Sequence, residues 1–274
     1  MQKLSGALAR ERVEAEVRER IAAIEARSET VRLALFRVGD RPDDCGYERS
    51  ILRAAQRLGI GTETHVFAAD VTEKTLLTAL TDAAMDPAVN GMLLFRPLPE
   101  HLRTDRVGTA IPAQKDVDGM LLEKSAFLPC TPEACMRLLA AYGIDPKGKR
   151  CVVIGRSAVV GKPLAELLQK AGAVVTVCHT QTPDVPAETR TAELLFAACG
   201  KPRLVDRTYL SPGQIIVDVG FHPTETGVTG DVCAEAAEEC AAAYTPVPGG
   251  VGAVTMPVML LHTVLAHEMQ HMRG

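Results

Sequence analysis

Apolar residues follow two different spacings along the first half of the chain. They recur at helical spacing over residues 5–27, whereas residues 31–38 form a short apolar run that ends at glycine and proline. This alternation of strands and helices predicts a parallel sheet with helices over its faces. Further elements of both kinds follow: helices over 47–58 and 72–85, and strands over 65–68 and 91–95.

The second half repeats the alternation and adds a glycine-rich turn. A strand over 149–154 enters the turn Gly155–Gly161, and a helix over 163–171 and a strand over 173–178 follow it. Such a unit binds dinucleotides, because the turn amides and the helix N-terminus can face a pyrophosphate. The spacing differs from G-x-G-x-x-G, so the turn alone also fits an ordinary tight connection. Three more elements complete the pattern: a helix over 131–142 and strands over 194–198 and 214–219.

Composition and charge exclude several classes of function. The chain has 274 residues, of which 47% are hydrophobic and 23% are charged, as in a globular protein. A net charge of −4 without blocks of like charge argues against a nucleic-acid partner. No apolar run reaches the ~18 residues of a membrane span, and no secretion signal opens the chain. The 8 cysteines are scattered without a C-x-x-C pair, which predicts reduced thiols and a cytoplasmic protein.

The end of the second strand in the dinucleotide unit bears on the choice of cofactor. Enzymes specific for NAD often place an acidic residue there to bind the ribose hydroxyls. This chain has Thr180 at that point and Arg156 in the glycine-rich turn. A hydroxyl and a cation suit a 2′-phosphate, so we predict NADP as the cofactor, with NAD as the open alternative.

A series of short motifs resembles the methylenetetrahydrofolate dehydrogenase/cyclohydrolase family, the FolD-type proteins. They occur in the family's order and extend over nearly the whole chain. The KDVDG and TPVPGGVG strings are the most specific of them. The matching segments are Tyr47 with the helix ending at 58–60, RPLP at 96–99, KDVDG at 115–119, PCTP at 129–132, VIGRS at 153–157 with VGKP at 160–163, IVDVG at 216–220, GDV at 230–232 and TPVPGGVG at 245–252.

The resemblance implies an α/β fold of two domains with a cleft between them. A folate-side catalytic domain would comprise residues 1–119 and 254–274, and a Rossmann-type NAD(P)-binding domain would comprise residues 120–253. The implied reaction is oxidation of 5,10-methylenetetrahydrofolate to 5,10-methenyltetrahydrofolate, with hydride transfer to NAD(P)+. Family members are usually homodimers, so a homodimer is expected.

The resemblance also implies roles for individual residues. Tyr47 and Asp118 are the candidate catalytic residues: the ring can stack on the folate, and the carboxylate can accept two hydrogen bonds from the pterin amidine. Taken alone, Tyr47 reads as a half-buried aromatic and Asp118 as a turn residue. Asp116 is expected to be a turn or capping carboxylate. The implied folate-binding residues are Tyr47, Ile51, Phe95, Asp118, Pro248, Gly249 and Gly250. The implied cofactor-binding residues are Gly155, Arg156, Ser157, Gly161, Thr180 and Phe221.

Two departures from the family pattern concern the hydrolytic half of the reaction. Ile51 stands where the bifunctional family has a lysine, and Phe95 stands where it has a glutamine. Neither side chain can move a proton, so we predict a dehydrogenase with weak or absent cyclohydrolase activity that depends on a separate cyclohydrolase. Two alternatives remain open. One is the full bifunctional enzyme, with Arg96 or a water chain replacing the lysine, and the other is a non-catalytic folate- and dinucleotide-binding protein.

The chain ends close to an H-E-x-x-H string. On a helix, His267 and His271 would share one face, as in zinc proteases. The string lies near the carboxyl end and leaves no downstream third ligand. We therefore interpret it as a solvated helix end and predict no metal site.

Overall fold

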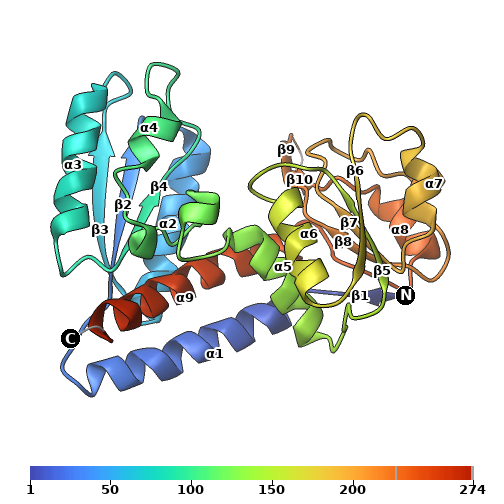
Figure 1. The fold of residues 1–274 in the computed structure, drawn as a ribbon, viewed down its shortest axis with the longest axis horizontal. Helices are drawn as coiled ribbons and strands as arrows, with labels where there is room; N and C mark the ends of the chain where they lie inside the picture. The colour runs from blue at the N-terminus through green and yellow to red at the C-terminus, as the bar shows by residue number, and fades with distance from the viewer. Residues whose placement is uncertain (226, 273–274) are drawn as a thin grey trace. The chain divides into compact units, whose positions relative to one another are not determined.

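The computed structural model describes residues 1–225 and 227–272, and the chain forms two compact units (Figure 1). Residues 13–128 and 256–274 make up one, which we call the three-stranded unit. Residues 1–12 and 129–255 make up the other, which we call the six-stranded unit. The first twelve residues therefore lie with the second half of the chain, whereas the sequence pattern placed them in the first domain. The predicted domain limits and the cleft stay predictions.

The three-stranded unit contains a parallel sheet of strand order β3-β2-β4. Leu33, Ala34, Leu35 and Phe36 of the central strand are fully buried, which explains why this strand reads as a continuous apolar run. Figure 1 shows α2 and α3 packed along the strands. The bounds are β2 Arg32–Val38, β3 Gly61–Phe67, β4 Gly91–Leu94, α2 Pro42–Arg57, α3 Glu73–Met85, α4 Thr104–Gly108, η1 Ala113–Lys115 and η2 Leu122–Lys124.

Helix α2 begins five residues before the predicted start at Tyr47. Pro42 occupies its first turn, where the missing N–H of proline is not needed. Asp43 and Asp44 follow in the same turn, where negative charge stabilises the helix dipole. The sequence pattern missed this start because the first turn carries few apolar residues.

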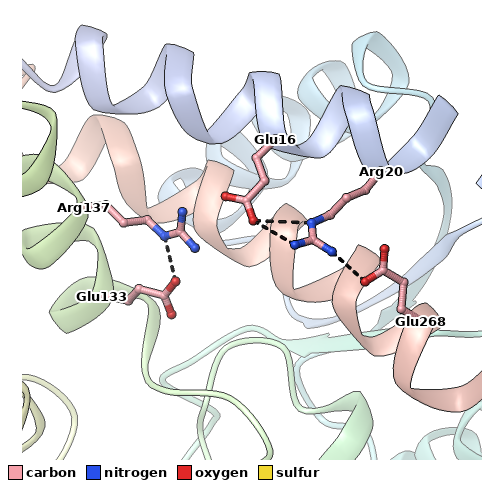
Figure 2. A network of polar contacts seen from close by, with 5 residues as sticks. All are labelled: Glu16, Arg20, Glu133, Arg137 and Glu268. Atoms are coloured by element: carbon pink, nitrogen blue, oxygen red, sulfur yellow. Dashed lines mark hydrogen bonds and ion pairs between the residues drawn. The ribbon is translucent and has the colours of Figure 1, made fainter. Parts of the chain in front are cut away.

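Two long helices, α1 (Gly6–Glu25) and α9 (Gly252–His271), each contribute residues to both units. Within the three-stranded unit they are joined by Arg20, which donates hydrogen bonds to Glu16 of α1 and to Glu268 of α9, the latter at 2.8 Å (Figure 2). The six-stranded unit has an intrahelical pair of its own, between Glu133 and Arg137 at 2.8 Å. Glu268 of the last helix is thus part of the packing between α1 and α9 and does not simply face solvent.

The six-stranded unit is built on a parallel sheet of order β1-β11-β8-β7-β5-β6. Figure 1 shows α5 and α6 on one side of the sheet and α7 and α8 on the other, which is the doubly wound arrangement. The predicted α/β fold class and parallel sheets are confirmed. The bounds are β1 Gln2–Lys3, α5 Cys130–Ala141, β5 Arg150–Ile154, α6 Gly161–Lys170, β6 Val174–Cys178, α7 Val185–Arg190, β7 Leu194–Ala197, η3 Arg207–Tyr209, β8 Ile215–Asp218, β9 His222–Thr224, β10 Gly227–Thr229, α8 Ala234–Cys240 and β11 Ala243–Tyr244.

Candidate active site

Three predicted folate-side residues come together where α2 meets the end of β4. Tyr47 is 41% exposed, and its ring meets the ring of Phe95 edge-on, with centroids 6.0 Å apart and an interplanar angle of 71°. Ile51 lies one helical turn beyond Tyr47 and is fully buried. Position 51 is therefore closed to solvent, and Tyr47 is the member of this group that offers a surface to a ligand.

Asp118 lies at the end of the KDVDG string and pairs with Arg96. The guanidinium Nη2 donates to Asp118 Oδ2 at 2.8 Å, and the two side chains are 27% and 31% exposed. A guanidinium and a pterin amidine present similar planar pairs of N–H donors. A carboxylate has about four acceptor positions, so a second planar donor can either share Asp118 with Arg96 or displace it.

Lys115, at the start of the same string, stabilises the end of a helix. It is almost fully buried, and its ammonium donates to carbonyl groups at the carboxyl end of α3. A cation at this end of a helix also interacts favourably with the negative end of the helix dipole. Burial lowers the pKa of Lys115 because it disfavours the charged form. The sequence analysis assigned this lysine no role. The accepting carbonyls belong to Ala83, Ala84 and Asp86.

Asp116 fixes the turn that follows. Its carboxylate accepts hydrogen bonds from the backbone N–H groups of Met120 at 3.0 Å and Leu121 at 2.8 Å. The expectation that Asp116 is a capping carboxylate is confirmed. Lys115 and Asp116 together hold the backbone on the amino side of Asp118, so one string supplies both the ligand-facing carboxylate and its support.

Arg37 of β2 holds the helix that carries Tyr47. It is 7% exposed, its Nε lies 2.5 Å from Glu48 Oε2, and its Nη1 lies 2.8 Å from Asp40 Oδ1. These carboxylates raise the pKa of Arg37. Since Glu48 follows Tyr47 directly, this buried ion pair fixes the tyrosine's position. Sequence analysis missed it, because nothing local links Arg37 to Glu48.

In the six-stranded unit, the glycine-rich turn excludes side chains at two points. A Cβ atom on Gly155, which has a φ of 117°, would lie 2.1 Å from the carbonyl oxygen of Ala198. A Cβ on Gly161 would lie 2.1 Å from the carbonyl oxygen of Gly155. Ser157 closes the turn, since its Oγ accepts from the N–H groups of Val160 at 3.2 Å and Gly161 at 3.3 Å. The tight packing keeps this backbone at the N-terminus of α6.

The other predicted cofactor residues follow the carboxyl ends of three strands of the same parallel sheet. Arg156 comes after β5, Thr180 after β6 and Phe221 after β8, and all three are exposed. Phe221 is 64% exposed, which is unusual for an aromatic residue. Parallel strands end at the same edge of a sheet, which is where doubly wound folds bind their ligands.

A buried carboxylate fixes the backbone on both sides of Phe221. Asp218 accepts hydrogen bonds of 2.9 Å from the backbone N–H groups of Gly220, Asp231 and Val232. Burial raises the pKa of Asp218 to about 6, although these three bonds favour the ionised form. Asp218 belongs to the IVDVG string, and sequence analysis gave it no role.

Asp231 of the GDV string continues this network. Its Oδ1 lies 2.7 Å from His222 Nε2, and its Oδ2 accepts from the N–H of Gly200 at 2.9 Å. A Cβ on Gly230 would lie 1.9 Å from Asp218 Oδ2, so only glycine fits beside the carboxylate. The two strings therefore join the ends of β7 and β8 to the β9-β10 hairpin.

The Pro248–Gly250 turn belongs to the six-stranded unit. Pro248 and Gly249 are exposed, whereas Gly250 is buried. Gly249 has a φ of 98° and accepts a hydrogen bond of 2.7 Å from the N–H of Gly6. An exposed backbone without side chains can approach a flat ligand closely. This turn thus lies in a different unit from Tyr47, Ile51, Phe95 and Asp118.

Within the described residues, no helix is long and apolar enough to cross a membrane.

Sequence models of one family match both halves of the chain. The tetrahydrofolate dehydrogenase/cyclohydrolase catalytic domain matches residues 4–118, and the NAD(P)-binding domain of the same family matches residues 129–271. The bifunctional protein FolD of Moorella thermoacetica is 41% identical over 263 residues, which cover 93% of this chain and 94% of the relative.

Solved structures agree with the family models. The bifunctional enzyme FolD from Campylobacter jejuni has a TM-score of 0.93 and 35% identity, covering 98% of this chain and 99% of its own. The Trypanosoma brucei methylenetetrahydrofolate dehydrogenase-cyclohydrolase, solved with NADP and an inhibitor, has a TM-score of 0.88 and 31% identity over 98% of both chains. The resemblance stated from the motifs is confirmed: this chain belongs to the tetrahydrofolate dehydrogenase/cyclohydrolase family, with a catalytic domain and an NAD(P)-binding domain.

Proposed function

We propose that the protein oxidises 5,10-methylenetetrahydrofolate to 5,10-methenyltetrahydrofolate and transfers the hydride to a nicotinamide dinucleotide. The observation that carries this proposal is Asp118, a partly exposed carboxylate held by the buried Lys115 and Asp116. It supplies the acceptor that a pterin amidine requires. The exposed ring of Tyr47 supplies a stacking surface in the same unit.

The hydride step makes modest demands on the side chains. The dinucleotide supplies the chemistry as hydride acceptor, and the substrate nitrogens stabilise the cation that forms. The protein's task is to hold the two ring systems face to face. This orientation alone can accelerate the hydride transfer strongly. Tyr47 and Asp118 orient the folate in this proposal. The rigid backbone around Gly155, Ser157 and Gly161 orients the dinucleotide phosphates.

Hydrolysis of the methenyl product makes a different demand, because a proton must move as water attacks. We propose that this step is weak in the present protein. Ile51 and Phe95 have hydrocarbon side chains without an ionisable or hydrogen-bonding group, so neither can transfer or position a proton, and both are buried. Loss of a general acid or base typically lowers a rate by about 10²–10⁴-fold.

The full bifunctional enzyme is the second candidate, and the names of the relatives favour it over the monofunctional one. The FolD proteins of Moorella thermoacetica and Campylobacter jejuni are both described as bifunctional. In that case another group must serve the hydrolysis. Arg96 directly follows Phe95, but it pairs with Asp118, and a guanidinium exchanges protons poorly near neutral pH.

A steady-state assay of the purified protein separates these candidates. Methylenetetrahydrofolate with NADP+ or NAD+ tests the oxidation through formation of the reduced cofactor. Methenyltetrahydrofolate alone tests the hydrolysis through loss of its absorbance, corrected for the uncatalysed rate. Oxidation without catalysed hydrolysis supports the monofunctional enzyme. Hydrolysis at a rate like that of oxidation supports the bifunctional one, and the absence of both activities supports a binding protein.

Further parts of the proposal rest on the sequence and the family. We propose NADP as the preferred cofactor because Arg156 and Thr180 are both exposed at the sheet edge and can meet a 2′-phosphate. We also propose a homodimer in the cytoplasm, which depends on a separate cyclohydrolase if the hydrolysis is lost.

A further inference from the structure

The last two turns of α9 carry two histidines on one face. His267 and His271 are four residues apart, and their rings stack with centroids 4.0 Å apart at an angle of 27°. His267 is only 1% exposed, whereas His271 is exposed. The interpretation of this segment as a solvated helix end is therefore wrong for His267.

A third potential ligand comes from far upstream in the sequence. Glu29 lies between α1 and β2, and its Oε2 lies 3.0 Å from Nε2 of His267. One ligand atom from each of Glu29, His267 and His271 can be chosen so that all three lie within 4.8 Å of one another. The sequence downstream of the histidines offers no third ligand, whereas the tertiary structure brings one from upstream. All three residues belong to the three-stranded unit.

The hydrogen bonds of the imidazoles leave ring nitrogens available for a metal ion. Nδ1 of His271 lies 2.8 Å from the backbone carbonyl oxygen of His267, so this nitrogen carries the proton and Nε2 bears a lone pair. A histidine ligand commonly donates its other N–H to a carbonyl in this way. Among the buried side-chain nitrogen and oxygen atoms of the described residues, Nδ1 of His267 is the one without a hydrogen-bond partner. Leaving such an atom unsatisfied is unfavourable, and a ligand that contacts it removes this cost.

A neighbouring cation shares the third ligand. Arg27 donates to Glu29 Oε2 at 3.1 Å. The guanidinium of Arg27 competes with a cation for this carboxylate, which weakens a metal site without abolishing it. Glu268, the acidic residue of the H-E-x-x-H string, instead pairs with Arg20 at 2.8 Å (Figure 2). It is therefore not placed as the general base of a zinc protease.

We propose that Glu29, His267 and His271 form a structural binding site for a zinc-like divalent cation. Two imidazoles and a carboxylate are ligands that Zn²⁺ prefers, and water completes a tetrahedral set. The exposed ring of His271 provides the route of entry. A bound ion links the segment after α1 to the end of α9. This proposal replaces the expectation of no metal site and does not depend on the proposed function.

Calorimetric titration of the chelator-treated, full-length protein with ZnCl₂ tests the proposal. The informative variants are His271→Gln and Glu29→Gln, because neither residue is buried and both proteins should fold. His101→Gln is the matched control, since His101 is an exposed histidine of the same unit whose Nε2 contacts the carbonyl of Val71 at 2.9 Å. We expect one equivalent of zinc to bind the parent and the control, with affinity at least about tenfold lower in the two variants.

Two further measurements exclude a thiol site, which matters because the chain has 8 cysteines. Zinc should raise the melting temperature of the parent and the control but not that of the two variants. Co²⁺ bound to the parent should show the visible absorption of a tetrahedral site without a thiolate charge-transfer band. Equal zinc affinity in Glu29→Gln and the parent, a thiolate band, or no stoichiometric binding would each overturn the proposal. Unchanged melting of the metal-free variants confirms that they fold.

Discussion

Arg96 and Asp118 show how one residue can alter the recognition of a ligand by its neighbour. The carboxylate that the family assigns to the pterin accepts a hydrogen bond of 2.8 Å from the Arg96 guanidinium. The pair is partly exposed, and such pairs contribute about 0.2–1 kcal/mol. If Asp118 binds the folate as proposed, Arg96 therefore competes with the substrate to a modest extent and does not block it.

Replacement of Arg96 by leucine tests this competition. We expect Arg96→Leu to lower the KM for methylenetetrahydrofolate by up to about fivefold, because 0.2–1 kcal/mol of pairing no longer has to be overcome. The value of kcat for oxidation should change little. Asp118→Asn, measured in the same assay, should instead raise KM, because it removes the carboxylate itself. A higher KM in Arg96→Leu would mean that Arg96 binds the substrate directly.

Ile51 and Phe95 lead to a second prediction at this scale. The double variant Ile51→Lys with Phe95→Gln reintroduces the cation and the amide of the family, so hydrolysis of methenyltetrahydrofolate should rise by about 10²-fold or more. Ile51→Leu is the control for disturbance of this buried position. If the parent protein already hydrolyses methenyltetrahydrofolate as fast as it oxidises methylenetetrahydrofolate, the prediction is wrong. The far-ultraviolet circular dichroism of each variant checks that it is folded.

At the scale of elements, buried charges hold the strand and helix ends that carry the site. Lys115 stabilises the end of α3, Arg37 joins β2 to α2, and Asp218 joins the end of β8 to the β9-β10 hairpin. A buried charge that lost its partners would be costly, so these residues determine the local backbone closely. Lys115 and Asp218 belong to the family's motifs, which thus contain supporting residues as well as predicted ligand-binding ones.

The titration of Asp218 gives a prediction at the scale of the element. Burial raises its pKa from 3.8 to about 6, so the folded protein retains a proton that the unfolded chain releases between these pH values. Its contribution to stability is therefore largest below pH 3.8 and falls as the pH rises through 6. Carboxyl-carbon NMR should show this midpoint near pH 6. Asp206, whose pKa is lowered by hydrogen bonds from Thr208, should titrate below its usual range in the same spectra. An ordinary midpoint for Asp218 would mean that its three backbone hydrogen bonds offset the effect of burial, and would contradict the prediction.

At the scale of the whole molecule, two units of unequal sheet size share two long helices, α1 and α9. The predicted folate-binding side chains of Tyr47, Phe95 and Asp118 lie in the three-stranded unit, and the glycine-rich turn predicted to bind the dinucleotide lies in the six-stranded one. A ligand that binds only the folded protein stabilises it in proportion to its affinity.

The preferred cofactor can therefore be identified from its effect on the melting temperature of the whole protein. We expect NADP+ at about 100 times its Kd to raise the melting temperature by about 5–10 °C, and NAD+ at the same concentration to raise it less. Arg156→Gln should remove most of the difference, because the 2′-phosphate loses its cation. Lys162→Gln is a suitable control, since it changes an exposed cation just inside α6. An equal or larger shift with NAD+ would show that the preference for NADP is wrong.

Sequence by itself determined the features that depend on neighbouring residues. The parallel strands, most helices and the glycine-rich turn follow from local periodicity and from backbone positions that only glycine can occupy, such as Gly155. The motifs also identified the family. Short elements could not be predicted from the sequence. Strand β1 has two residues, which is too short for a detectable pattern, and its place beside β11 depends on residues 243–244.

Tertiary structure alone decided which distant side chains meet. The pairs Arg37–Glu48, Arg96–Asp118 and Glu29–His267 are separated by 11, 22 and 238 positions in the chain. No local spacing encodes such contacts, because they depend on how strands and helices pack. For this reason the H-E-x-x-H string reads as a helix end in the sequence, whereas in the folded protein Glu29 lies beside a buried His267.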